Sequence, residues 1–270
     1  MIRYNMSHDD YLAVPAASKS TLWTIHTKSP LHAVTERERT SAMEFGTAAH
    51  CAVLEPAKFT SRFLRGPDDR RGNRWKEAVE QAPIGMDVLT AGDYDAAEAL
   101  ADRALGNADV QGLIKGAQIE VSAFATFNGV DCKCRPDAVN GSILIDLKTT
   151  TDASEHAFRH TCHRFGYHVQ EAWYRDVWCR AGDLMPDTRA IPAMLGADLD
   201  FAFIVVESKP PFAIRVFELE WAAVVAGQLI ATSAFATYRE CLRTGVWPGY
   251  PAGVQKLSLD YRPTMGDLED

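Results

Sequence analysis

The sequence predicts an α/β fold in which helices flank a mixed central β-sheet. Residues 1–118 carry mainly helical patterns, whereas strand-like runs begin at residue 119. These runs are separated by two Asn-Gly pairs, a strong short signal for β-hairpins. A long helical segment and a second strand pair follow them. We expect the 270 residues to form a single domain, with 1–118 as its helical N-terminal part and 119–270 as its core.

The N-terminal part contains three helical patterns. Residues 17–35 open on Ala17-Ser18-Lys19-Ser20, which supplies an N-cap for the periodic apolar run that follows. Residues 41–54 are rich in small and apolar side chains and are ended by Glu55-Pro56, which is typical of a buried helix. Residues 93–115 are rich in alanine and favour a further helix.

The second half begins with three strand-like runs, Ile119–Phe127, Val130–Val139 and Ser142–Lys148. Because Asn-Gly joins each run to the next, we expect a three-stranded antiparallel meander. One long helix is expected over about residues 153–181. Strands at Phe201–Glu207 and Phe212–Glu218, a helix over about 220–244 and an irregular tail complete the expected order.

Composition excludes several classes of protein. Hydrophobic residues make up 47% of the chain and charged residues 24%, as in ordinary globular proteins. No stretch approaches the ~18–20 uninterrupted apolar residues of a membrane span, and the first residues lack the apolar region of a signal peptide. We therefore expect a cytoplasmic protein without a membrane partner. The six cysteines include no CxxC pair, which argues against a zinc ribbon, an iron–sulfur cluster and a disulfide framework.

The net charge of −8 argues at first against a nucleic-acid partner. Local patches decide binding, however, and a site built from carboxylates itself lowers the total charge. Residues 62–76 contain six Arg or Lys side chains against two Asp, with Gly66, Pro67 and Gly72 as helix breakers. This segment is predicted to be a basic loop, which could be either a DNA contact or simply a solvated surface.

The two hairpins bring acidic side chains together. If Asn128-Gly129 is a two-residue turn, Glu120 lies opposite Asp137. If Asn140-Gly141 is another, Asp137 lies opposite Leu144. A bulge at Pro136, which lacks a ladder donor, would shift this parity by one residue.

Side chains alternate along a strand, so Leu144, Asp146 and Lys148 share one face. Glu120, Asp137, Asp146 and Lys148 are therefore expected to project from the same face of adjoining strands. Carboxylates this close repel one another unless a cation neutralises them, and hard oxygen ligands suit Mg²⁺ or Mn²⁺. Lys148 beside such a cation could hold or polarise an attacking water. The alternative is a solvated polar strand face with incidental acids.

Three motifs resemble those of PD-(D/E)XK nucleases of the RecB type. Arg135-Pro136-Asp137 followed by Ile145-Asp146-Leu147-Lys148 resembles the nuclease core, with Asp146 in the D/E position. Phe45-Gly46-Thr47-Ala48-Ala49-His50 is similar to the helix that supplies a histidine ligand. Gln170-Glu171-Ala172-Trp173-Tyr174 is similar to the QxxxY motif, whose two named side chains share a helix face.

Further segments resemble RecE-like exonucleases, the exodeoxyribonuclease VIII-like enzymes of phages and prophages. These segments are Ser18-Lys19-Ser20, Gly72-Asn73-Arg74-Trp75-Lys76, Cys132-Lys133-Cys134-Arg135-Pro136-Asp137, Gly166-Tyr167 and Gly245-Val246-Trp247-Pro248-Gly249-Tyr250. The resemblance runs through most of the chain, and its motifs keep their order. It implies a restriction-endonuclease-like PD-(D/E)XK core.

The resemblance also implies roles for individual residues. His50, Asp137 and Asp146 would hold the metal together with the Leu147 carbonyl. Lys148 would handle the water, and Glu120 would support the site or a second metal. Gln170 and Tyr174 would contact the scissile strand or brace the site. Ser18 would lie near a 5′-phosphate. Independently of the resemblance, Lys19 adds positive charge at the same helix start, and Arg71 and Arg74 of the basic segment could contact DNA. Taken alone, His50 reads as a core histidine, and Gln170 and Tyr174 read as helix surface.

The function implied is a Mg²⁺- or Mn²⁺-dependent 5′→3′ exonuclease acting on linear double-stranded DNA ends. Such an enzyme leaves 3′ overhangs for a single-strand annealing protein, forms a ring-shaped homo-oligomer and belongs to a phage or prophage. A structure-specific or restriction-type endonuclease is the alternative on the same core. Two further classes are a DNA-binding relative without catalysis, which the intact Asp-x-Lys disfavours, and a metal-binding protein without DNA affinity.

Overall fold

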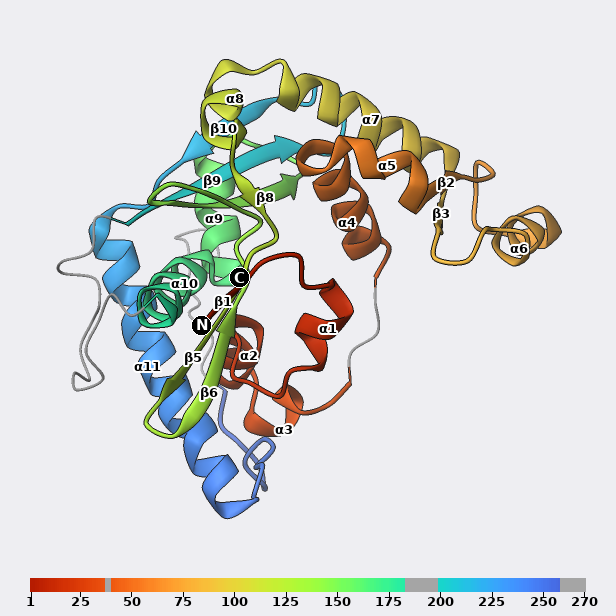
Figure 1. Ribbon diagram of the computed structural model, residues 1–270. Helices are drawn as coiled ribbons and strands as arrows, with labels where there is room; N and C mark the ends of the chain where they lie inside the picture. The colour runs from red at the N-terminus through yellow and green to blue at the C-terminus, as the bar shows by residue number, and fades with distance from the viewer. Residues whose placement is uncertain (37–39, 183–198, 258–270) are drawn as a thin grey trace, which may run out of the picture.

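The computed structural model describes residues 1–36, 40–182 and 199–257 (Figure 1). The tail expected over 258–270 lies outside these residues. The N-terminal part contains short strands and helices: β1 (Ile2–Arg3), α1 (His8–Ala13), α2 (Lys19–Thr27), α3 (Pro30–Ala33), α4 (Ser41–Leu54), α5 (Pro56–Arg62), β2 (Phe63–Arg65), α6 (Gly72–Glu80), β3 (Asp87–Leu89), α7 (Ala91–Leu105) and α8 (Ala108–Ile114).

The remaining elements form the sheets and their covering helices: β4 (Gln118–Ile119), β5 (Ser122–Phe127), β6 (Val130–Cys134), β7 (Ala138–Asn140), β8 (Ile143–Thr150), α9 (Glu155–Phe165), α10 (Tyr167–Ala181), β9 (Asp200–Glu207), β10 (Ile214–Phe217) and α11 (Trp221–Thr244). The central sheet has the strand order β10-β9-β8-β7-β4. Only β8 and β9 pair in parallel there, so the sheet is mixed and the predicted α/β fold class is confirmed.

The central sheet separates two hydrophobic cores. Ile145 and Leu147 of β8 lie in the core beneath α4 and α7. Leu144 of β8 and Phe203 of β9 lie in the other core, which includes side chains of α2, α9, α10 and α11. Figure 1 shows the two groups of helices on opposite sides of β8 and β9. The alternation of β8 therefore sends Asp146, like Leu144, toward α10.

The expected meander forms, but it is divided between two sheets. β5 and β6 join β1 in a separate three-stranded sheet, whereas β4 and β7 pair in the central sheet. The hairpin changes sheet at Glu120, whose φ is +56°, and at Pro136, which has no N–H for a ladder bond. The expectation of one continuous three-stranded sheet was therefore wrong.

The Asn128-Gly129 turn has the expected register, with Phe127 opposite Val130. The same register holds beyond Pro136, where the Glu120 N–H donates to the Asp137 carbonyl at 2.9 Å. Pro136 therefore causes no net slip.

The second turn was misplaced by one residue. Asn140 pairs with Ile143, so Gly141 and Ser142 form the turn. Continued by one step, this register places Asp137 opposite Asp146 instead of Leu144. A one-residue displacement of the turn moves the pairing by two residues, so the predicted face of each side chain is preserved.

Three expected helices are interrupted. The segment 153–181 breaks at Gly166, which ends α9 with a φ of +66°. A Cβ there would lie 2.5 Å from the Trp23 ring, so the close approach of α2 also requires glycine. The segment 93–115 divides at Gly106 and Asn107, because the Asn107 side chain caps α8. The segment 17–35 divides into α2 and α3, with Pro30 beginning the second helix. By contrast, 41–54 is a single helix, α4, as expected.

The basic segment 62–76 is more regular than a loop, since it contains β2 and the start of α6. β2 pairs in parallel with β3, a pairing that the sequence did not reveal. Several of its charges are already compensated: Arg65 forms a bidentate pair with Asp95, and Arg70 contacts Glu44 and Asp93. Fewer cations are therefore available than the composition implied.

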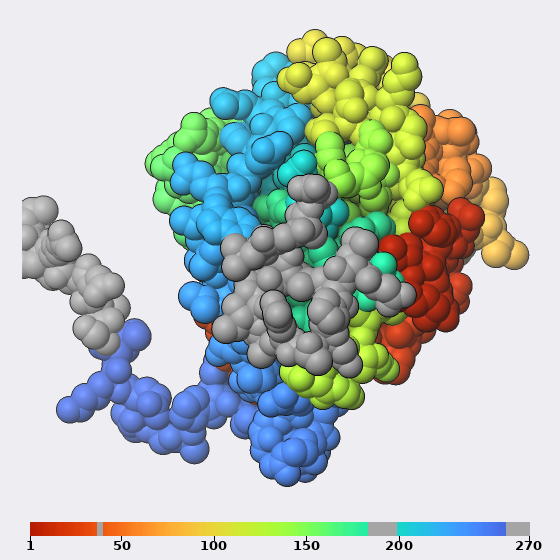
Figure 2. All heavy atoms as spheres, turned by 60° about the vertical axis from the view of Figure 1, so that its left-hand side comes forward, coloured from red at the N-terminus to blue at the C-terminus, as the bar shows by residue number. Residues whose placement is uncertain are grey.

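Helix α11 packs one face against α10 and α2. Among the described residues it is the one helix long and apolar enough to span a membrane by length and composition. Core helices of globular proteins have the same length and composition. Beyond α11 the chain first contacts α3, where the Leu31 N–H donates to the Pro248 carbonyl at 3.0 Å. The described residues that follow extend away from the body of the molecule (Figure 2), and Val254 among them is fully exposed.

We expect Gly227→Ala to destabilise the protein by about 1–3 kcal/mol. A Cβ on Gly227 of α11 would lie 2.1 Å from the carbonyl oxygen of His168, so α10 and α11 would have to separate. Gly112→Ala is the matched control, because no atom lies within 4 Å of its added Cβ and α8 gains helix propensity. Urea unfolding should show a loss of stability for the first variant and a small gain for the second. Equal effects would contradict this account of α11 packing.

Candidate active site

Asp146 and Lys148 form the centre of the candidate site. Both lie on β8 and point toward α10, where the Lys148 ammonium contacts Asp146 Oδ1. Asp146 is 2% exposed, which means that its carboxylate has little access to bulk water. Gln170 of α10 connects the two, since its Nε2 donates to Asp146 Oδ2 and its Oε1 accepts from Lys148 Nζ at 3.1 Å. Gln170 therefore braces the Asp-x-Lys pair.

Asp137 lies at the adjacent end of β7, next to Pro136. Its Oδ2 accepts the Leu147 N–H at 2.7 Å, which fixes the carboxylate at the edge of β8. The same oxygen lies 3.4 Å from Nδ1 of His50. The structure thus places three of the expected metal ligands, His50, Asp137 and Asp146, in one region.

His50 reaches this region because α4 lies close to β8. The helix begins at the Thr40 cap, which accepts the Met43 N–H, and ends just before Pro56. Small residues permit the close approach: a Cβ on Gly46 would sit 3.9 Å from Thr149 of β8. Ala49 is fully buried beside His50.

Glu120 completes an acidic group next to Asp137. The ligand atoms of His50, Glu120 and Asp137 all lie within 4.8 Å of one another. Arg135 contacts the Glu120 carboxylate and also donates to Ser122 Oγ at 2.7 Å and to the Met6 carbonyl at 2.9 Å. Glu120 is therefore held in place by a buried guanidinium.

Sequence reasoning quoted Arg135 only as part of a motif and gave it no role. A usable signal was present, because the 128–129 turn places Arg135 opposite Ser122 in a strand pair with buried residues. A charged side chain in such a position requires partners. Lys133 was also missed: it is buried and donates to the carbonyls of Tyr11, Leu12 and Val14, which anchors the end of α1.

Tyr174, the last residue of the QxxxY motif, lies beside the acidic group in a buried position. Burial raises its pKa far above the usual value, and the nearby Tyr11, Asp146 and Asp137 raise it further. Its ring packs against Phe201 at 6.2 Å. Tyr174 thus borders the acidic group as a neutral phenol.

The carboxyl groups of the site have divergent proton affinities. Burial raises the pKa of Asp146, and the charge of Asp137 raises it further. Burial and Asp137 raise the pKa of Glu120 despite its contact with Arg135. Burial also acts to raise the pKa of Asp137, but His50 and Lys148 outweigh it and hold that pKa below the usual value. Repulsion between these acids is the expected cost of gathering them on one sheet.

The two basic groups respond to the same acids. Burial by itself would lower the pKa of His50, but Asp137 raises it to about 9. Burial also disfavours the charged Lys148, yet Asp146 and Asp137 keep its pKa above the usual value. Lys148 is therefore an ammonium at neutral pH. A cation bound at His50 would have to displace the proton from its imidazole.

These residues fit a divalent metal. Asp146 Oδ1 is buried and pairs with the Lys148 ammonium without a hydrogen bond of good geometry, so it keeps a lone pair that a metal ion could use. Beside it, one imidazole and two carboxylates converge. This donor set, mainly oxygen with one nitrogen, suits Mg²⁺ or Mn²⁺. Asp137, Asp146, Glu120 and His50 would hold the ion. The proposed contribution of the Leu147 carbonyl stays a prediction.

Ser18 and Lys19 lie at the start of α2, where Ser18 Oγ accepts the Thr21 N–H. The Lys19 ammonium donates to the Phe165 carbonyl at 2.6 Å. Burial and, to a smaller extent, the charge of Lys148 lower the pKa of Lys19 to about 7. Lys19 is thus close enough to the centre of the site to be affected by its charges.

Arg71 and Arg74 are not brought to the site. They lie at the start of α6, which projects from the edge of the molecule (Figure 1). Both side chains are exposed. A DNA contact there would be remote from Asp146.

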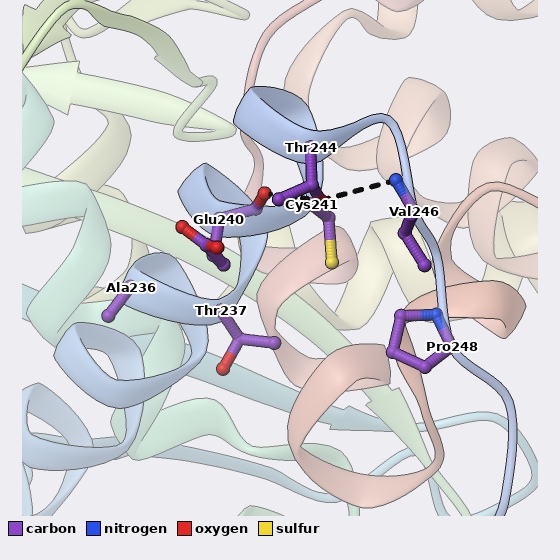
Figure 3. Close-up of a pocket in the computed structure, with 7 residues that line it drawn as sticks. All are labelled: Ala236, Thr237, Glu240, Cys241, Thr244, Val246 and Pro248. Atoms are coloured by element: carbon purple, nitrogen blue, oxygen red, sulfur yellow. Dashed lines mark hydrogen bonds between the residues drawn. The ribbon is translucent and has the colours of Figure 1, made fainter.

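A hollow at the C-terminal end of α11 is separate from the site (Figure 3). Its lining consists of Ala236, Thr237, Glu240, Cys241, Thr244, Val246 and Pro248. None of the residues expected to act in catalysis lines it. The Val246 N–H donates to Thr244 Oγ1 at 3.2 Å, which closes the turn after α11.

The mixed sheet, the Asp137 and Asp-x-Lys carboxylates and the histidine-bearing helix together define a nuclease domain of the PD-(D/E)XK superfamily. Residues 25–258 match a family described as "PDDEXK-like domain of unknown function (DUF3799)". The chain belongs to this family. No curated protein matches the chain.

The fold is shared with a solved structure described as "Putative exonuclease" from Eubacterium rectale. The two chains are 12% identical, each is covered over 99% of its length, and the TM-score is 0.66. At this identity the likeness shows the fold alone. A structure of SSO0001 matches with 14% identity over 87% of this chain and 97% of its own, but its TM-score of 0.30 supports no argument.

We expect Asp137→Asn and Asp146→Asn each to weaken Mn²⁺ or Mg²⁺ binding by about ten- to a hundred-fold. His50→Ala should have a smaller effect, because imidazole is a neutral and softer ligand than carboxylate. Asp152→Asn is the control, since its carboxylate is exposed and caps the Ser154 N–H away from the acidic group. Calorimetric titration measures the affinities. Unchanged affinity in both site variants would remove the metal assignment.

Proposed function

We propose that the protein is a Mg²⁺- or Mn²⁺-dependent exonuclease that hydrolyses linear double-stranded DNA from its 5′ ends and leaves 3′ overhangs. The observation that carries the nuclease chemistry is the Asp146–Lys148–Gln170 cluster beside the converging His50, Glu120 and Asp137 side chains. Oxygen donors and a fixed ammonium are a combination suited to phosphodiester hydrolysis.

The site residues of the chain each have a defined part in this chemistry. The bound cation would polarise the phosphate and lower the pKa of a water. Asp146 and Asp137, as carboxylates, would hold that cation in place. Lys148 is held by Asp146 and Gln170 with its N–H groups directed by those two contacts, and so it can hold the water or the developing negative charge. Burial of Asp146 limits competing bulk water.

The 5′ polarity is supported by the start of α2. The N-terminus of this nine-residue helix favours an anion, and Lys19 adds a positive charge there. The ammonium groups of Lys19 and Lys148 lie 5.6 and 4.4 Å from the centroid of the same Tyr167 ring, so the two share one region. A terminal phosphate at α2 would thus lie near the hydrolytic centre, and its negative charge would raise the pKa of Lys19 and favour the charged form.

The resemblance to RecE-like exonucleases supports two further parts of the proposal. The protein acts as a ring-shaped homo-oligomer, and a single-strand annealing protein receives its 3′ overhangs. Both are consistent with a phage or prophage recombination enzyme. Light scattering with the purified chain tests the oligomer directly.

We expect Lys148→Ala to reduce hydrolysis by about a hundred- to ten-thousand-fold while metal affinity changes little. The variant removes the ammonium that handles the water and leaves the metal ligands in place. Lys58→Ala is the control, because Lys58 pairs with Glu55 on the surface. The assay uses end-labelled linear duplex with Mg²⁺, and closed-circular duplex serves to detect endonuclease activity. Turnover like that of the wild type would refute the assignment of Lys148.

Duplex with 5′-phosphoryl ends should be degraded about ten- to a hundred-fold faster than duplex with 5′-hydroxyl ends, as a charge-assisted hydrogen bond predicts. Ser18→Ala should lose much of this difference and keep hydrolysis. Because Ser18 also caps α2, Ser154→Ala serves as a control that removes the cap of α9. Equal rates on both ends in the wild type, or release of label from 3′ ends first, would remove the polarity and leave the nuclease assignment intact.

A further inference from the structure

Lys148 has a third contact, with Tyr167, to which neither the metal chemistry nor the family resemblance assigns a role. Its ammonium lies 4.4 Å from the centroid of the Tyr167 ring. Asp146 and Gln170 approach the same ammonium through hydrogen-bonding or ionic contacts, whereas Tyr167 presents a ring. A cation within about 6 Å of a ring centroid is attracted by the π-electrons.

The Tyr167 ring is held rigidly by other aromatic side chains. It stacks on Phe203 of β9 with a centroid distance of 5.8 Å and an interplanar angle of 23°. Phe158 of α9 lies 5.9 Å from it, and Phe165 stacks at 6.0 Å. Phe203 pairs with Asp146 across β8 and β9, so the aromatic support begins directly beside the catalytic carboxylate.

The chain places Tyr167 at this point through Gly166. The left-handed backbone of Gly166 ends α9 and starts α10, so Tyr167 is the first residue of α10 and Gln170 follows one turn later. Both side chains contact Lys148. The same ring also carries the Lys19 ammonium, at 5.6 Å from its centroid.

We propose that Tyr167 is a positioning residue that holds the Lys148 ammonium over its ring face and so fixes the group that handles the water. The inference rests on the proposed nuclease function. It requires the ring and not the hydroxyl, because the contact is made to the ring centroid. The attraction between Tyr167 and Lys148 does not involve the Asp146 carboxylate. It would therefore remain if that carboxylate turned to a metal ion.

Substitutions at Tyr167 distinguish the effect of the aromatic ring from the effect of side-chain volume. Tyr167→Phe keeps the ring and should retain kcat within about twofold. Tyr167→Leu and Tyr167→Met keep apolar volume without the ring and should lower kcat about three- to thirty-fold, the range of a cation–π contact. Their Mn²⁺ affinity should remain unchanged.

Phe235→Leu is the matched control for packing damage. Phe235 is buried in the same hydrophobic core, but its ring packs against Phe127 and Trp173, at 5.9 and 5.8 Å, and not against the rings that support Tyr167. It should lose stability and keep kcat. An equal loss of kcat in Phe235→Leu, or wild-type kcat in both Tyr167→Leu and Tyr167→Met, would overturn the inference.

A second measurement is independent of hydrolysis. In protein labelled with 13Cε-lysine, the Lys148 side-chain protons should resonate upfield because they lie over the ring. This shift should persist in Tyr167→Phe and disappear in Tyr167→Leu, with the signal assigned from Lys148→Ala. A shift that Tyr167→Leu leaves unchanged would refute the ring contact. A wild type that shows the shift but cleaves no DNA would refute the nuclease proposal and leave the Tyr167 contact standing.

Discussion

The parallel pairing of β8 with β9 is the constraint on which the site depends. With β8 inside the sheet, both of its faces are covered. Its successive side chains therefore enter the two hydrophobic cores alternately. Asp146 consequently enters a region of low polarity, where its charge is tolerated only with partners. Lys148 and Gln170 are those partners. The buried carboxylate therefore dictates which side chains α10 must present.

The acids of the site can lie together because each has its own basic partner, which offsets their mutual repulsion. Arg135 compensates Glu120, and His50 compensates Asp137. Asp146 retains an oxygen without a well-formed hydrogen bond. Lys148 compensates the charge of Asp146, so a divalent ion would bind by replacing the His50 proton and using the remaining lone pair of Asp146 Oδ1. This distinguishes the group from a solvated polar strand face.

The sequence predicted the relative position of Asp146 and Lys148 better than it predicted the elements around them. The alternation of side chains along a strand placed Asp146 and Lys148 on one face. Misplacing the 141–142 turn by one residue shifted the strand pairing by two residues, so the predicted faces did not change. The division of the meander at Glu120 could not be predicted, since a positive φ at a glutamate is set by tertiary contacts. Arg71 and Arg74 were assigned from local composition, which carries no information about their distance from Asp146. The role of Tyr167 depends on a ring lying over a cation from another element, which no spacing rule describes.

Gly166 links two parts of the molecule that lie far apart in the sequence. Trp23 of α2 packs where a side chain on Gly166 would be, so α2 and α10 meet without a spacer. Lys19 belongs to α2, whereas Tyr167 and Gln170 belong to α10. The position that would receive the end of a strand and the position that would cut it would therefore be joined through the close packing of α2 against the junction of α9 and α10. Under the proposed function, the separation between them would be a fixed length of the protein to which a substrate has to conform.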